Sequence, residues 1–343
     1  MGDVMMSSPA IRALKSSFSC KLTLLTSPKG EKLARLFPFV DDVIACNAPW
    51  VKSEQNDEVQ DFLNLVERLR ELKFDACVIF TVYSQNPMPA IMLAYLAGIP
   101  LRLSYCRENP YELLSDWVPD QEPYSLIKHQ VQRDLDLVQQ IGASTTDTAY
   151  RVQFNKAAED SVTEKLKEKG VHGPFLVFHC GVSEPKRQYP DQLWVASAKL
   201  TLAQLGIPIL FTGTMEEIDY VANIQQQVGG NSLSVAGLFS LEEFIYLLKE
   251  ASAVVSVNTS TIHLCSAVQT PVTVLYAQTN PQHTPWDVKH TLLEYSIPEE
   301  YKSKNEVIGY VDRHLYREKV DYPSPEKVLG SIKGLLSISL NTA

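Results

Sequence analysis

The chain has 343 residues, of which 45% are hydrophobic, and a formal net charge of −9 at pH 7. This length suits two domains better than one. The acidic balance argues against a nucleic-acid partner, which requires a basic face, so any phosphate site must be a local basic patch.

The six cysteines are scattered, and no two of them form a C-x-x-C pair. Most lie in apolar strand or helix patterns, which is typical of small core residues in a reducing compartment. We therefore expect neither a disulfide framework nor a zinc site. No apolar run has the length of a membrane span, and no signal peptide is visible at the N-terminus. These features indicate a cytoplasmic protein.

Strand-like runs alternate with amphipathic helical runs along the first part of the chain. Such alternation predicts an α/β fold with a parallel sheet covered on both faces. Residues 105–123 contain three prolines and interrupt the pattern, which predicts a loop or lid. The other expected elements are a helix starting near Val4, strands at 21–26, 42–46, 75–80 and 99–103, and helices at 31–37, 57–72, 89–97 and 126–141.

Residues 144–150 are polar and unpatterned, so we expect an inter-domain linker there. The alternation then resumes and continues to the C-terminus. Its expected helices are 157–169, 191–205, 216–228, 241–251, 260–268 and 324–336, and its expected strands are 175–179, 207–212, 232–235, 253–257 and 271–276.

The turn Asn258–Thr259–Ser260 joins a buried strand to a helix that begins at once. Asn, Thr and Ser are natural helix N-caps. The first turn of a helix offers unpaired N–H groups and the positive end of its dipole, which together bind phosphate. Taken alone, however, this turn is better explained as a well-capped connection without a ligand.

Four segments, in this order along nearly the whole chain, resemble glycosyltransferase family 9, the heptosyltransferase-like enzymes of lipopolysaccharide core synthesis. Each motif is weak by itself, and the ordered set is fairly specific. The segments are Gly2-Asp3 with the residues up to Lys15, His179–Ser183 with Lys186–Pro190, Asn258–His263, and Tyr276–Pro281.

The resemblance implies two Rossmann-like domains facing each other across a cleft, an arrangement of the GT-B type. Residues 1–150 would form the acceptor domain and residues 151–323 the nucleotide-sugar donor domain. Residues 324–343 would carry a helix that packs back on the N-terminal domain. Family members begin with a strand that runs into the Gly-Asp motif, whereas Met1 directly precedes Gly2 here. We therefore expect the first strand to be missing, through a late start codon or a truncation.

Asp3 is the candidate catalytic base. Sugar transfer requires an acceptor hydroxyl to lose its proton as it attacks, and a carboxylate can take that proton. The resemblance assigns this role to the aspartate of the Gly-Asp motif, which is Asp3. The sequence by itself favours a helix-capping role for Asp3, and the motif order shifts the preference to catalysis.

Lys186 and Arg187 are the candidate donor clamp, because the leaving nucleoside diphosphate needs fixed cations or a metal ion. No Asp-x-Asp motif lies in a suitable loop, so we expect a metal-independent mechanism and no cofactor. An isolated basic loop would more often be merely solvated. Residues at the carboxyl ends of strands complete the predicted donor site, namely Gly181, Ser183, Thr212 and Gly213, although each of them could be an ordinary turn residue.

The Asn258 turn departs from the family pattern Asp-Thr-Gly-x-x-His, since Asn258 and Ser260 replace the aspartate and the glycine. Asn258, Thr259, Ser260 and His263 are still predicted to bind the donor, although a histidine between apolar residues is more often packed in a core. The departures leave the donor sugar open. Ser7 and His129 are the predicted acceptor-binding residues.

By resemblance, the chain would be an inverting glycosyltransferase. It would transfer heptose or a related sugar from an ADP-sugar to a lipid-linked saccharide, with peripheral contact at the inner face of the cytoplasmic membrane. Two alternatives stay open: a degenerate, non-catalytic sugar-nucleotide-binding protein, and a sugar-nucleotide epimerase or hydrolase of GT-B fold. A dinucleotide oxidoreductase is disfavoured because no G-x-G-x-x-G follows a strand.

Overall fold

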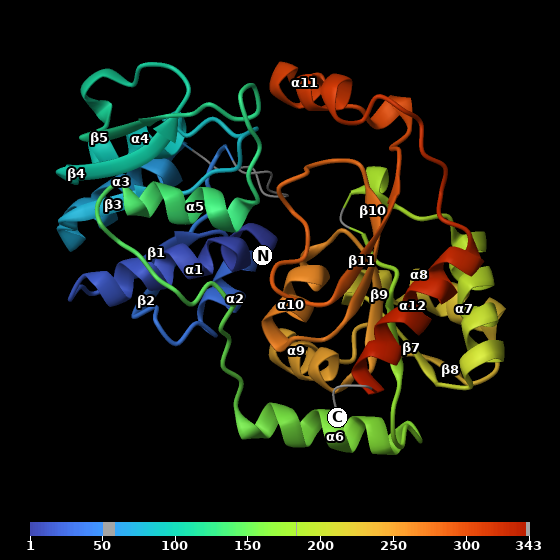
Figure 1. Cartoon of the computed structure of the whole chain (residues 1–343). Coiled ribbons are helices and arrows are strands. Elements are labelled where there is room, and N and C mark those ends of the chain that lie inside the picture. Colours follow the sequence, from blue (N-terminus) through green and yellow to red (C-terminus); the bar gives the residue numbers. More distant parts are fainter. Residues whose placement is uncertain (51–58, 183, 341–343) are drawn as a thin grey trace. The chain divides into compact units, whose positions relative to one another are not determined.

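A computed structural model describes residues 1–50, 59–182 and 184–340 of the chain (Figure 1). Its contacts divide the chain into two compact units. The first contains Met1, Asp3–Arg151 and Lys304–Val311, and the second contains Gly2, Val152–Ser303 and the described part of Asp312–Ala343.

The first unit contains two separate parallel sheets, one of two strands (β1–β2) and one of three (β3–β4–β5). No strand precedes helix α1 in the described chain. The apolar face predicted for α3 is buried through Leu65, Val66 and Leu69. The elements are α1 Gly2–Ser17, β1 Thr23–Thr26, α2 Pro28–Ala34, β2 Asp42–Ala45, α3 Val59–Leu72, β3 Ala76–Ile79, α4 Met88–Leu96, β4 Leu101–Cys106, η1 Tyr111–Leu113, β5 Asp116–Pro119 and α5 Gln130–Gln139.

Two predictions for this unit are corrected. Residues 105–123 are not a continuous loop, because they contain η1 and strand β5. This short strand pairs with β4 and is largely exposed, so it carries no buried apolar run that could identify it. The helix predicted from residue 126 begins at Gln130, since His129 is its N-cap.

The second unit has one parallel sheet of six strands in the order β11-β10-β9-β6-β7-β8. Every residue of β9 and β10 is buried, because helices cover both faces of the sheet (Figure 1). The elements are α6 Lys156–Glu168, β6 Leu176–His179, η2 Pro185–Arg187, α7 Asp191–Leu205, β7 Ile209–Thr212, η3 Met215–Glu217, α8 Ile218–Val228, β8 Ser232–Ser234, α9 Leu241–Glu250, β9 Ala253–Val257, α10 Ser260–Val268, β10 Val272–Ala277, β11 His290–Tyr295, η4 Glu299–Tyr301 and α12 Pro325–Leu340. Helix α11 Glu306–His314 has residues in both units.

The terminal helix α12 packs on the sheet of the second unit, and its expected packing on the N-terminal domain stays a prediction. It lies against α7 and the strands β9 to β11. Val328 and Ile332 are completely buried in the core of this unit. Lys304–Val311 is a segment from the C-terminal part of the chain that belongs to the first unit. Strand β11 and helix α11 had not been predicted.

Candidate functional site

The carboxyl ends of β6 and β9 form the topological switch point of the six-stranded sheet. From β6 the chain continues through β7 to β8, and from β9 it continues in the opposite direction through β10 to β11. Ligands of open parallel sheets bind beside such a point, outside the carboxyl ends of the strands. The loop after β6 carries Gly181 and Arg187, and the turn after β9 carries Asn258 and Thr259. The topology therefore brings together the two segments that the sequence predicted.

Arg187 connects these two loops. Its Nη1 donates a hydrogen bond of 2.9 Å to the main-chain carbonyl of Asn258, and its Nη2 lies 2.9 Å from Glu184 Oε2. The main-chain carbonyl of Arg187 accepts a bond of 2.6 Å from the Tyr295 hydroxyl. Within the described chain, Arg187 Nε is buried without a hydrogen-bond partner. The guanidinium is thus held in place between the two loops, with Nη1 and Nη2 bound and Nε buried.

Lys186 is held less firmly than Arg187. Its Nζ lies 3.5 Å from Glu184 Oε1, and its side chain is 31% exposed. Glu184 is therefore shared by both cations. Two positive charges and one carboxylate leave this loop with an excess of positive charge, as a phosphate site requires.

The N-terminus of α10 lies directly after Asn258. Thr259 is the N-cap of this helix, yet its side chain makes no capping hydrogen bond. Its Oγ1 is buried without a partner among residues the structure describes, and the first turn contains no acidic residue. The helix dipole and the first N–H groups therefore face no competing side-chain anion of their own helix. Together with Arg187, this helix start can hold a phosphate group.

The Asn258 side chain supports the fold of the turn. Its Nδ2 donates bonds of 3.1 Å to the Ala277 carbonyl and to Thr279 Oγ1, and its Oδ1 accepts one of 3.1 Å from the Ala277 N–H. A carboxylate could accept from Ala277 but could not donate to its carbonyl. The amide thus joins the ends of β9 and β10, while the Asn258 carbonyl holds Arg187.

Gly181 and Gly213 leave room for the carboxylate of Glu217, which the sequence analysis did not identify. A Cβ at Gly181 would lie 2.1 Å from Glu217 Oε2, and one at Gly213 would lie 3.1 Å from the same atom. Glu217 Oε2 also accepts a bond of 2.8 Å from the Thr214 N–H in a capping box. The pattern Thr214-x-x-Glu217 is a capping signal that could have revealed this residue.

Thr212 is bound to His179 at the ends of β7 and β6. Its Oγ1 lies 2.9 Å from His179 Nδ1, and the residue is 2% exposed. Burial lowers the pKa of His179 to about 4, because desolvation disfavours the imidazolium, while the charge of Glu217 acts in the opposite direction. His179 is therefore neutral at pH 7, and the pair joins the two strand ends.

The remaining predicted donor residues lie at the start of α10 or outside the described chain. Ser260 is the first residue of α10. His263 is 3% exposed, and its ring lies 6.5 Å from that of His283 in an edge-on contact. Ser183 lies outside the described residues.

The predicted residues of the first unit have distinct positions. Asp3 lies in the first turn of α1 and is exposed, and the N-cap of this helix is Met1 rather than Asp3. Ser7, one turn later, is buried, and its hydroxyl donates a bond of 2.6 Å to Asp134 Oδ2. His129 Nδ1 accepts a bond of 3.2 Å from the Val131 N–H. Ser7 and His129 thus both make hydrogen bonds that support local structure.

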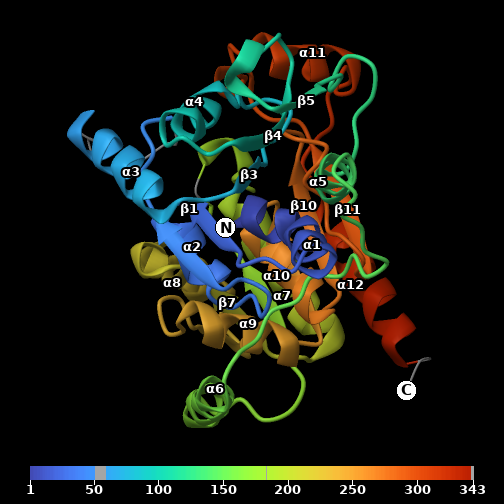
Figure 2. The same ribbon diagram turned by 90° about the vertical axis from the view of Figure 1, so that its left-hand side faces the viewer.

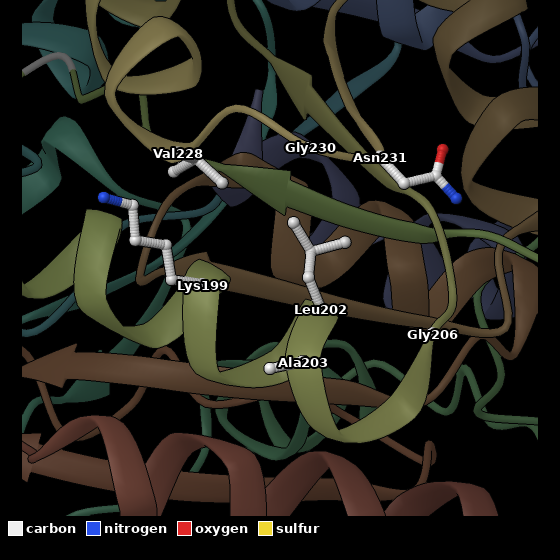
Figure 3. A pocket seen from close by; sticks show the side chains of 7 residues that line it. All are labelled: Lys199, Leu202, Ala203, Gly206, Val228, Gly230 and Asn231. Atoms are coloured by element: carbon white, nitrogen blue, oxygen red, sulfur yellow. The ribbon is translucent and has the colours of Figure 1, made fainter.

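A shallow groove of about 340 Å³ opens elsewhere on the second unit (Figure 3). It lies at the end of α7 and the turn before β8, where the strands have their amino ends. It is therefore separate from the carboxyl edge that carries Arg187. Its lining residues are Lys199, Leu202, Ala203, Gly206, Val228, Gly230 and Asn231.

Across residues 1–50, 59–182 and 184–340, no group of three or more His, Cys, Asp or Glu side chains is placed to hold a metal ion. Within the same residues, no helix combines the length and the apolar character needed to cross a membrane.

Comparisons with known proteins identify the family of the chain. The family model of glycosyltransferase family 9 (heptosyltransferase) matches residues 62–309. Lipopolysaccharide heptosyltransferase 2 of Escherichia coli K12 is 24% identical over 300 residues, which cover 83% of this chain and 82% of that protein. The protein of the same name from Salmonella typhimurium is 22% identical over 352 residues, which cover 98% of this chain and 96% of that protein.

Solved structures share the fold. A family 9 glycosyltransferase of Veillonella parvula superposes with a TM-score of 0.78 at 17% identity, over 98% of this chain and 94% of that one. The ADP-heptose lipopolysaccharide heptosyltransferase II of E. coli superposes with a TM-score of 0.71 at 19% identity, over 98% of this chain and 96% of that one. An E. coli heptosyltransferase solved with ADP-2-deoxy-2-fluoro heptose superposes with a TM-score of 0.66 at 17% identity, over 97% of this chain and 96% of that one. These likenesses confirm the predicted α/β fold class of GT-B type.

Proposed function

Because the chain belongs to glycosyltransferase family 9, we propose that it transfers heptose, or a related sugar, from an ADP-sugar to a lipopolysaccharide-type or other glycan acceptor. The observation that carries the donor half is the anion site at the switch point. There Arg187 is fixed against the Asn258 carbonyl, and the start of α10 lacks a side-chain cap. The ADP moiety is supported by the relative that was solved with an ADP-sugar analogue.

The proposed reaction is a single displacement with inversion. The acceptor oxygen attacks the anomeric carbon of the donor while its proton moves to Asp3. The bond between the anomeric carbon and the phosphate oxygen breaks, and ADP leaves with the electron pair. Arg187 and the N–H groups at the start of α10 stabilise the negative charge that develops on the diphosphate. Fixed donors can do this without a metal ion, so we propose a metal-independent transfer.

We propose that the acceptor is a lipid-linked saccharide, which the protein binds at the inner face of the cytoplasmic membrane. The relatives support this, because their names identify lipopolysaccharide and lipooligosaccharide heptosyltransferases. Met92, Tyr95 and Leu96 form an exposed apolar cluster at the end of α4. Exposed aliphatic and aromatic side chains of this kind favour peripheral contact with a lipid surface.

A thermal-shift titration against ADP, UDP, GDP, CDP and NAD tests the donor assignment. A ligand that binds only the folded protein raises the melting temperature according to its concentration relative to Kd. We expect ADP to stabilise the protein selectively, and to do so equally well in the presence of EDTA. Selective stabilisation by another nucleotide would overturn ADP as the donor nucleotide. ADP binding without any sugar transfer to heptose-containing or lipid-linked acceptors would favour the non-catalytic sugar-nucleotide-binding protein.

A further inference from the structure

Asp134 is a buried carboxyl group that has no assigned role in the reaction proposed above. It lies on α5 and is 1% exposed. Its Oδ2 accepts the bond from Ser7, and its Oδ1 accepts one of 2.8 Å from Gln130 Nε2. Both donors are uncharged. Burying a carboxyl group costs free energy that uncharged donors offset only in part, and such groups are common at functional sites.

The neighbouring cation does not pair directly with Asp134. Arg133 Nη1 lies 2.9 Å from Asp120 Oδ1 and 2.5 Å from Glu122 Oε2, so its guanidinium is committed to two other carboxylates. Burial raises the pKa of Asp134 to about 7, while the two hydrogen bonds and the Arg133 charge act in the opposite direction. Asp134 therefore changes its charge close to neutral pH.

Asp134 is tied to the helix that carries the candidate base. Helix α5 lies beside α1 in both views (Figures 1 and 2). The bond between Ser7 and Asp134 joins the two helices one turn after Asp3. The negative charge of Asp3 is itself one of the causes that raise the pKa of Asp134. Asp3 and Asp134 thus lie close enough within the first unit for their charges to interact.

We propose that Asp134 is a positioning residue for the transfer: it holds α1 through Ser7, and its negative charge favours the movement of the acceptor proton onto Asp3. This inference rests on the proposed function, because it needs Asp3 to be the base. A negative charge near the place where a proton arrives favours its arrival. Other ionisable groups that interact with Asp134 include Arg133, Tyr105 and Tyr150. Both tyrosines are neutral near pH 7, because burial raises their pKa above the usual 10.

The kinetic test is the pH profile of kcat and kcat/KM for the full chain and for Asp134→Asn. The asparagine has the same shape and can still accept the Ser7 hydrogen bond. We expect kcat and kcat/KM of the wild type to rise with increasing pH, with a midpoint near pH 7. Asp134→Asn should lack this rise, and its kcat should be about tenfold lower than that of the wild type at pH 8. Asp136→Asn is the matched control on the same helix, because Asp136 pairs with Lys128 and Gln132. It should keep the rise.

A profile of Asp134→Asn that runs parallel to that of the wild type would overturn the inference, whether or not the variant is less stable. Ser7→Ala separates the two parts of the role: it should lower kcat at every pH and keep the rise. A Ser7→Ala variant with wild-type kcat would show that the link between the helices does not contribute.

Carboxyl ¹³C NMR separates this inference from the proposed function, because it needs no activity. We expect Asp134 to titrate near pH 7, and the change Asp3→Asn to lower that midpoint. A wild type that transfers no sugar would contradict the proposed function. Independently of that result, an Asp134 titration midpoint that is the same in Asp3→Asn as in the wild type would contradict the interaction between the two carboxyl groups.

Discussion

The guanidinium of Arg187 donates a hydrogen bond of 2.9 Å to the main-chain carbonyl of Asn258. This bond joins the loop after β6 to the turn after β9, which are the two strands on either side of the topological switch point. It also places the arginine beside the N-terminus of α10. Fixed positive charge and a helix start therefore come together at the edge of the sheet where a diphosphate is expected.

Arg187→Ala should reduce kcat/KM for the donor by about 10²- to 10³-fold, because it removes a fixed cation from the leaving diphosphate. Arg187→Lys keeps the charge but loses the fork that reaches both Asn258 and Glu184, so about a tenfold loss is expected. Steady-state kinetics with varied donor would measure both. Lys186→Ala is the control in the same loop, and a loss as large as that of Arg187→Ala would contradict the distinction between the two cations.

Asn258→Asp should destabilise the second unit by about 1–3 kcal/mol, because a buried carboxylate cannot donate to the Ala277 carbonyl. It should also raise the KM for the donor, since it adds a negative charge beside the anion site. Chemical denaturation and donor kinetics would test the two effects. Asn223→Asp makes the same exchange on an exposed part of α8 and should change neither quantity. A fully stable Asn258→Asp variant would show that its amide bonds to β10 are dispensable.

His179 and Asp134 should give stability opposite dependences on pH. The lowered pKa of His179 means that the unfolded chain binds more protons than the folded chain between about pH 4 and 6.5. The stability of the second unit should therefore fall by up to about 3 kcal/mol as the pH drops through this range. The raised pKa of Asp134 means that the folded chain binds more protons between about pH 4 and 7. The stability of the first unit should fall by up to about 4 kcal/mol as the pH rises.

Denaturation curves from pH 4.5 to 7.5 would separate these contributions. His179→Gln should remove the loss at low pH, and Asp134→Asn should remove the loss at high pH. The exposed His172 provides the control His172→Gln, which should leave the curve unchanged. If either variant at position 179 or 134 kept the wild-type slope, the corresponding assignment would be wrong.

The sequence was most informative where local signals and burial agree. The predicted bounds of β9 and α10 match the structure, because a continuous apolar run is followed directly by N-cap residues. Strands β5 and β11 were missed because they are short or partly exposed and mix polar with apolar residues. Family 9 membership and the GT-B fold class were predicted from ordered motifs and are confirmed.

Side-chain environments could not be predicted in the same way. The sequence shows an asparagine at 258 but not that its amide bridges to Ala277. Asp134 lies in an ordinary amphipathic helix pattern, and only tertiary packing brings Ser7 to it. Contacts between residues more than one hundred positions apart leave no local trace in a single sequence. The roles of the predicted site residues in catalysis and donor binding therefore remain predictions.

The most direct test of the account is a transfer assay with ADP-heptose and a heptose-containing lipopolysaccharide acceptor, run for the wild type and for Asp3→Asn. Release of ADP and the mass of the glycan product would be followed together. We expect the wild type to add one heptose per acceptor, and Asp3→Asn to lose about 10²- to 10⁴-fold in kcat while it still binds ADP. Unchanged turnover in Asp3→Asn would remove Asp3 from the mechanism, and a wild type that binds ADP but adds no sugar to any such acceptor would contradict the proposed transfer itself.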